Sequence, residues 1–122
     1  MIRWLGYLLL LRVLPFTVIG RPMKEGTWEG AINYIAGTAT FKPCTPRGET
    51  WWLKGKRYSD IEEEIKRRHA AITENPYEKV YARVRGKINK TSGQYGALGT
   101  HSRVLYVEDI LDLRPREESD CS

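Results

Sequence analysis

The sequence is poor in the residues that build metal centres and redox motifs. Its 122 residues include only two cysteines and two histidines. Cys44 and Cys121 stand far apart and form no C-x-x-C pair, so a zinc or thioredoxin-like site has no support. In an exported chain such a pair is typical of one disulfide, whereas in a cytosolic chain it would be two unrelated thiols. We therefore predict no metal and no other cofactor.

Catalytic constellations are lacking as well. His101 and Ser102 are adjacent, but no acid, oxyanion loop or nucleophile-elbow motif accompanies them. The run Glu62–Glu64 has the pattern of a solvated helix face and not of paired acid and base carboxylates. His69 falls on the inner or boundary face of the same helix, without cysteine or carboxylate ligands at metal-binding spacing. The sequence predicts a protein that is not an enzyme.

Extremes of charge and hydrophobicity are also absent. Hydrophobic residues make up 41% of the chain and charged residues 29%, which excludes a disordered chain and a polytopic membrane protein. The length suits one domain with one core. The formal net charge of +5 favours an anionic partner such as nucleic acid only weakly, because many small proteins carry such an excess.

Residues 1–20 form the most apolar segment of the chain. A basic residue, Arg3, precedes an apolar run, and Val18-Ile19-Gly20 offers a site for cleavage. We predict a signal peptide or export segment over 1–20. The alternatives are an apolar strand or helix of a cytosolic domain and an uncleaved anchor, although Arg12 and Pro15 argue against a spanning helix. No cysteine follows Gly20, so a lipoprotein acceptor is missing and membrane anchoring stays open.

The rest of the chain alternates between apolar and polar residues in five segments. We expect a polar leader over 21–27 and a single domain over 28–122. Within it, period-two patterns predict strands over 28–34, 38–42, 49–53, 79–88 and 103–113. Gly30 indicates a bend or a close backbone approach, and a slip in phase near Glu108-Asp109 predicts a bulge.

One helix is expected between the third and fourth strands. Ser59 and Glu62 have the spacing of a capping box, and Asn75-Pro76 ends the pattern. Three strands, a helix and two strands match an all-β fold with one helix, the five-stranded OB-type closed barrel, whose helix covers one end. Closure of this kind also removes exposed sheet edges.

A basic and aromatic surface is the sharpest candidate for a binding site. Three basic residues share one face of the fourth strand, and four aromatic residues are expected near it. This candidate binding face consists of Trp51, Trp52, Tyr58, Arg83, Arg85, Lys87 and Tyr95. Such a face suits single-stranded nucleic acid or an anionic glycan. The alternative is that one tryptophan fills the barrel and the arginines pair with Glu49 or Asp112.

Several of these residues together resemble a known family. The positions that carry the resemblance are Gly30, Tyr34, Ala36, Ala39, Phe41, Cys44, Val80-Tyr-Ala-Arg-Val-Arg-Gly86, Gly93-Gln-Tyr-Gly96 and Cys121. Over about residues 28–121 the chain resembles the C-terminal OB-fold domain of the NlpE family of envelope-stress lipoproteins. It is also similar to small uncharacterised bacterial envelope lipoproteins built on the same pattern.

The resemblance implies a function as well as a fold. It implies that Cys44 pairs with Cys121 and that the protein is exported to the periplasm or cell envelope. It further implies a non-enzymatic role through contact with another envelope protein, in envelope stress or adhesion sensing. The family's copper role does not carry over, because its C-x-x-C domain is absent here. The alternative function is an oligonucleotide- or oligosaccharide-binding module that uses the candidate binding face.

Overall fold

The structure is a computed structural model that describes residues 23–45, 48–96 and 98–121. This part of the chain contains five strands and one helix. In chain order they are β1 (Met23–Ile35), β2 (Thr38–Pro43), β3 (Trp51–Gly55), α2 (Ile61–Ile72), β4 (Val80–Asn89) and β5 (Val104–Pro115). The prediction of a mainly β fold with five strands and one helix is confirmed. The export segment predicted over 1–20 lies outside the described residues.

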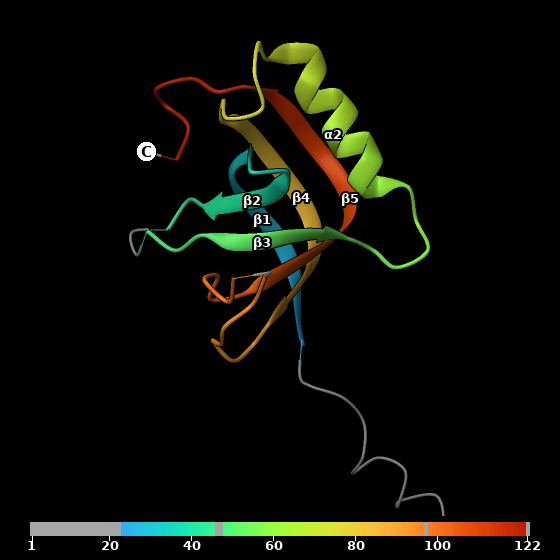
Figure 1. Cartoon of the computed structure of the whole chain (residues 1–122), viewed down its shortest axis with the longest axis vertical. Coiled ribbons are helices and arrows are strands. Elements are labelled where there is room, and N and C mark those ends of the chain that lie inside the picture. Colours follow the sequence, from blue (N-terminus) through green and yellow to red (C-terminus); the bar gives the residue numbers. More distant parts are fainter. Residues whose placement is uncertain (1–22, 46–47, 97, 122) are drawn as a thin grey trace, which may run out of the picture.

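The strands close into a barrel in the order β1-β2-β3-β5-β4 (Figure 1). β1 pairs with both β2 and β4, so the sheet returns to its first strand. All pairs are antiparallel except β3 with β5, which is parallel. Helix α2 follows β3 in the chain and packs against β5 and β3. None of the helices in the described ranges is long and apolar enough to cross a membrane.

The first strand starts earlier than the sequence indicates. β1 begins at Met23, so most of the expected leader over 21–27 belongs to the sheet. Met23 pairs with Asn89 and Gly26 with Gly86, both in β4. The leader prediction was wrong because backbone pairing needs no apolar side chain, and exposed Lys24 extends the ladder as readily as a buried residue would.

The bulge expected near Glu108-Asp109 is confirmed. Asp109 pairs with Arg85 and Val107 with Gly86, which leaves Glu108 as the extra residue in β5. A second irregularity lies between Arg83 and Val84 of β4. Bulges of this kind increase the local twist and bend, which a small barrel needs for closure.

The start of helix α2 differs from the expected capping box. Asp60 is the N-cap residue, and no side chain caps the first turn. The hydroxyl of Ser59 instead donates to the carbonyl oxygen of Lys56 at 2.5 Å, within the turn that links β3 to the helix. The helix buries Ile65 and His69, so His69 lies on its inner face as expected.

The core fills the barrel with aliphatic and aromatic side chains from all five strands and the helix. Its largest fully buried apolar members are Phe41, Ile32, Leu53, Ile65 and Leu105. Gly30 lies where β1 crosses the core, and a Cβ atom there would meet the carbonyl of Lys42 and the ring of Phe41 at 2.7 Å. The close backbone approach predicted at Gly30 is therefore confirmed.

Candidate functional site at the disulfide-anchored tail

A disulfide joins the end of β2 to the C-terminal tail, which we define as residues 116–121. Cys44 follows β2 directly, and its Cα atom lies 4.8 Å from that of Cys121. The pairing that the family resemblance implied is confirmed. The bond closes a loop across 77 residues. In the chain-entropy model such a loop contributes about 4 kcal/mol to stability. For a domain of this size that is a large share of the total.

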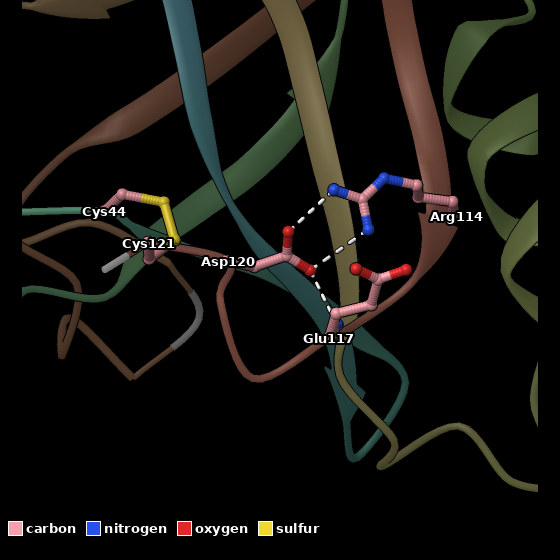
Figure 2. The surroundings of a disulfide bond; sticks show 5 residues. All are labelled: Cys44, Arg114, Glu117, Asp120 and Cys121. Carbon is pink, nitrogen blue, oxygen red and sulfur yellow. Dashed lines mark hydrogen bonds and ion pairs between the residues drawn. A yellow bond between two sulfur atoms is a disulfide. The ribbon is translucent and has the colours of Figure 1, made fainter.

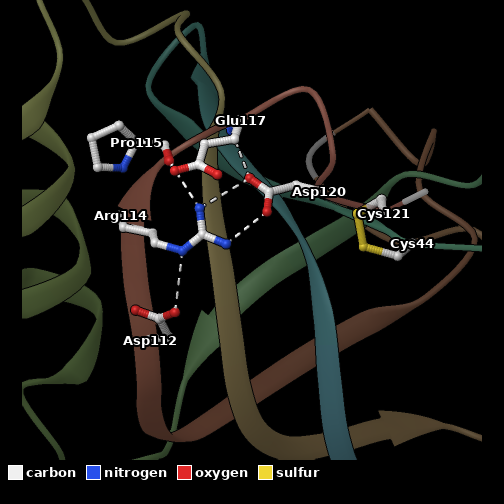
Figure 3. A network of polar contacts seen from close by, with 7 residues as sticks. All are labelled: Cys44, Asp112, Arg114, Pro115, Glu117, Asp120 and Cys121. Atoms are coloured by element: carbon white, nitrogen blue, oxygen red, sulfur yellow. Dashed lines mark hydrogen bonds and ion pairs between the residues drawn. A yellow bond between two sulfur atoms is a disulfide. The ribbon is translucent and has the colours of Figure 1, made fainter.

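An arginine at the end of β5 holds the same tail by charge (Figures 2 and 3). The guanidinium of Arg114 donates to the carboxylate of Asp120 at 2.6 Å, and Asp120 also accepts from the backbone N–H of Glu117 at 2.6 Å. The hydrogen bond from Arg114, and after it the one from the backbone of Glu117, hold the pKa of Asp120 below its usual value. The same contact raises the pKa of Arg114. Arg114 and the backbone of Glu117 thus hold Asp120, the residue beside Cys121.

The Arg114 side chain is itself held from several sides. It lies over the ring of Tyr81 in β4 at 4.2 Å from the ring centroid, and it forms an ion pair with Asp112 at 3.4 Å. It also donates to the carbonyl oxygen of Pro115 at 3.2 Å (Figure 3). Tyr81 is buried beneath it, and burial, followed by a hydrogen bond to Glu29, raises the pKa of this phenol. Arg114 therefore connects β4, β5 and the tail.

The aromatic members of the candidate binding face lie in different environments. Trp51 is 3% exposed and packs in the barrel between Trp28 and Phe41, so it cannot stack on a ligand at the surface. Trp52 is half-buried on β3, with the ammonium group of Lys54 5.0 Å from its ring centroid. The expectation that Trp51 belongs to an exposed face was wrong, because this strand turns Trp51 inward and Trp52 outward.

The other two aromatic members come from connecting segments. Tyr58 is 94% exposed in the turn before α2, with the guanidinium of Arg57 5.1 Å from its ring centroid. Tyr95 is half-buried in the loop after β4, where its backbone pairs with that of His101. The two residues lie on different connections, and no contact between them supports one continuous surface.

The basic members do share one face, as the alternation predicts. Arg83, Arg85 and Lys87 are all exposed on β4. Arg83 stands in register with Glu29 of β1 and Asp112 of β5. Arg85 stands in register with Asp109 and forms an ion pair with it. Opposite charges in neighbouring strands partly neutralise this row. The partner of Arg85 is Asp109 rather than Glu49 or Asp112, and Asp112 forms its ion pair with Arg114.

The two histidines are not brought together with other metal-binding groups. His69 is 2% exposed, and its Nε2–H donates to the carbonyl oxygen of Glu78 at 2.7 Å. His101 is half-buried in the loop after β4. No cluster of three histidine, cysteine or carboxylate side chains occurs within the described ranges. His69 is placed to hold the segment after α2 against the helix.

The tail network was missed by sequence reasoning. Arg114 and Asp120 lie in a polar stretch without periodicity, and only the position of Asp120 next to Cys121 gives a hint of their role. The hint becomes informative once the disulfide fixes the tail against β2, because Arg114 at the end of β5 is then within reach.

These features define a class: a small closed β-barrel with one helix and a C-terminal tail that a disulfide anchors to the second strand. A solved structure shares this fold. The chain is similar to the Cpx pathway activator NlpE from Escherichia coli, with a TM-score of 0.52 and 24% sequence identity. The likeness covers 82% of this chain and 44% of the NlpE chain. The resemblance to NlpE seen in the sequence is thus confirmed for the fold.

The chain spans less than half the length of the NlpE structure that it matches. Comparison with protein-family models finds no match, and comparison with curated proteins finds none either.

Proposed function

We propose that this chain is an exported, non-enzymatic envelope protein of the NlpE C-terminal type that acts by contact with another envelope protein. The observation that carries the proposal is the Cys44–Cys121 disulfide within an NlpE-like barrel. Disulfides form and persist in oxidising compartments such as the bacterial periplasm. A protein that relies on this bond for a large share of its stability folds best after export.

The topology supports an OB-type barrel in this proposal. The strand order β1-β2-β3-β5-β4, with one parallel pair between β3 and β5, leaves every strand with two neighbours. The helix lies between β3 and β4 in the chain. This is the arrangement of the five-stranded Greek-key barrel that binds varied partners in unrelated proteins.

Protein contact is supported by apolar side chains at one end of the barrel. A pocket of about 340 Å³ lies between the second half of α2 and the β1–β2 turn, lined in part by Tyr34, Ala70 and Tyr77. Tyr77 and Ile35 are exposed at this end. The amide of Asn33 donates to the carbonyl oxygen of Tyr77 at 3.2 Å and holds this segment beside β1. Exposed apolar groups around a hollow are typical of protein interaction sites.

A reporter of the Cpx pathway in Escherichia coli tests the proposal. The chain is produced with a functional export signal, and reporter output is compared with that from an unrelated exported disulfide protein of similar size. We expect reporter output several-fold above that of this control. The substitution Tyr77→Ala should lower the output, whereas Lys90→Ala should leave it unchanged. Output equal to the control would contradict a role of the NlpE type. Fractionation of the same cells checks that the protein reaches the envelope.

The alternative function, an oligonucleotide- or oligosaccharide-binding module, has weaker support. Its strongest feature is the exposed row of Arg83, Arg85 and Lys87. The ion pair between Arg85 and Asp109 and the burial of Trp51 both reduce what this row offers to a nucleic acid. Filter binding to a homopolymeric single strand at low and moderate salt tests it, since binding through phosphates weakens steeply as salt rises.

A further inference from the structure

A hollow of about 440 Å³ lies beside the disulfide, and none of the three exposed basic residues of β4 lines it. Ala31 of β1 and the two cysteines contribute to its walls, together with Lys42, Lys79 and Arg116. Its volume is many times the roughly 30 Å³ that one water molecule occupies in the liquid. The hollow therefore has room for a polyatomic group.

Three basic residues reach this hollow from three separate elements. Lys42 lies on β2 opposite Ala31 of β1. Lys79 immediately precedes β4, and Arg116 immediately follows β5. Val80 and Pro115 stand in register across β4 and β5, so Lys79 and Arg116, the residues next to them, come together at the same end of the sheet.

The positive charge of these residues is not neutralised locally. Among the described residues, Lys42, Lys79 and Arg116 form no ion pair, and no carboxylate lines the hollow. The carboxylate of Asp120 is engaged by Arg114 and by the backbone of Glu117. The charge of Arg116 contributes least among the groups that lower the pKa of Asp120, so this carboxylate interacts mainly with other partners. The site is thus distinct from the β4 row, where register brings carboxylates opposite the arginines.

The walls between the cations favour a compact anion over a nucleic-acid strand. Ala31 is 7% exposed and has a small side chain, and the exposed residue Thr45 adds a hydroxyl group to the lining. No aromatic side chain of the described residues lines the hollow, so bases would find no stacking platform there.

We propose that the hollow beside the disulfide binds a phosphate group, with the charged ends of Lys42, Lys79 and Arg116 on separate phosphate oxygens. Charge-assisted hydrogen bonds from arginine and lysine are the usual way in which proteins hold this group. The group is either free phosphate or the headgroup of an anionic phospholipid. The inference goes beyond the proposed function and needs no partner protein, so either can fail alone.

Titration of the oxidised, isotope-labelled chain with inorganic phosphate, followed by amide NMR shifts, is the first test. Sodium chloride at matched ionic strength is the control ion. We expect saturable shifts centred on Lys42, Lys79 and Arg116, and a loss of at least about tenfold in affinity in the triple variant K42Q/K79Q/R116Q. The matched triple K24Q/K87Q/K90Q removes the same charge elsewhere and changes affinity less than about twofold. This matched triple is remote from the hollow, since Lys87 lies about 27 Å from Lys79 along β4.

Vesicle flotation separates the two sources of phosphate. If the wild-type chain and the matched triple float with phosphatidic acid vesicles but not with phosphatidylcholine, and the K42Q/K79Q/R116Q triple does not, the ligand is a lipid headgroup. If only inorganic phosphate binds, the ligand is free phosphate. Both results support the site. The proposal would be overturned if phosphate caused the same NMR shifts as chloride, or if both triple variants lost the same affinity for phosphate. Either result would mean that the anion responds to the overall positive charge and not to this hollow. Thermal unfolding of each variant confirms that these exposed substitutions leave the fold intact.

Discussion

The guanidinium of Arg114 and the carboxylate of Asp120 lie 2.6 Å apart and connect the last strand to the residue before Cys121 (Figure 2). The disulfide and this ion pair therefore act on neighbouring residues of one short tail. The covalent bond attaches the tail to β2, and the ion pair attaches it to β5. Together they keep Arg116 at the edge of the hollow beside the disulfide.

Low pH should break the ion pair between Arg114 and Asp120. The native pKa of Asp120 is lowered, chiefly by Arg114, so its contribution to stability is present above the ordinary aspartate pKa of about 3.9 and is lost as pH falls through the lowered value. We expect Asp120→Asn to lower Tm at pH 6 and the gap from wild type to close as the pH falls below about 4. Thermal unfolding across pH measures the gap. A gap unchanged down to pH 2 would contradict the assignment.

Removal of the disulfide should cost more than any single side chain. In the double variant Cys44→Ser/Cys121→Ser we expect the free energy of unfolding to fall by up to about 4 kcal/mol. Urea unfolding measures the loss, and reduced wild-type protein is the matched comparison. If the wild-type protein unfolds at the same urea concentration with and without reductant, the bond does not stabilise the fold.

The core leaves no room for a side chain at Gly30. Gly30→Ala places a methyl group against the Lys42 carbonyl and the Phe41 ring. We expect a loss of about 1–3 kcal/mol in unfolding free energy, as overpacked cores show. Thr27→Ala, at an exposed position of the same strand, is the control and should change stability by less than about 0.5 kcal/mol. Equal effects from both substitutions would mean that β1 does not approach β2 as described.

The buried histidine acts as a structural hydrogen-bond donor. His69→Leu replaces the imidazole with an apolar side chain and leaves the carbonyl oxygen of Glu78 without its donor. A cost of about 1–3 kcal/mol follows from such an unsatisfied buried group. Ala71→Ser, at an exposed position of the same helix, is the control. Urea unfolding measures both, and a His69→Leu variant as stable as the control would refute this role.

The alkaline limit of stability depends on Tyr34. Burial, with the charge of Glu62 as a smaller cause, raises the pKa of this phenol from 10.0 to about 12. Because the folded-state value lies above the unfolded value, its contribution to stability is complete below pH 10 and is lost as pH rises toward 12. We expect Tyr34→Phe to retain more of its stability than wild type over this interval. Identical alkaline unfolding curves would contradict the burial of the phenol.

Much of the fold was predictable because the patterns that mark strands and bulges lie within short stretches of the sequence. Alternation along β4 located a strand, and the break in phase at Glu108 located the bulge opposite Arg85 and Gly86. The start of β1 was not predictable, because Met23 joins the sheet through backbone pairing with Asn89, which leaves no trace in side-chain polarity. The capping box was wrong because Asp60, and not Ser59, is the N-cap residue, while the hydroxyl of Ser59 donates to the carbonyl oxygen of Lys56 in the preceding turn.

The candidate sites were less predictable than the fold. The face of Arg83 follows from alternation, but the carboxylates that neutralise it come from strands far away in sequence. Trp51 and Trp52 are adjacent, and only the register of β3 decides which one enters the core. The hollow beside the disulfide depends on Lys42, Lys79 and Arg116, which the barrel alone brings together.

Intact-mass analysis of the protein recovered from the cells that produce it, alkylated with and without prior reduction, tests the central claim most directly. The account predicts that neither cysteine is alkylated before reduction and that both are alkylated afterwards, in a chain from which residues 1–20 have been removed. Two alkylated cysteines without reductant, in a chain that keeps those residues, would contradict a disulfide-anchored barrel of the cell envelope.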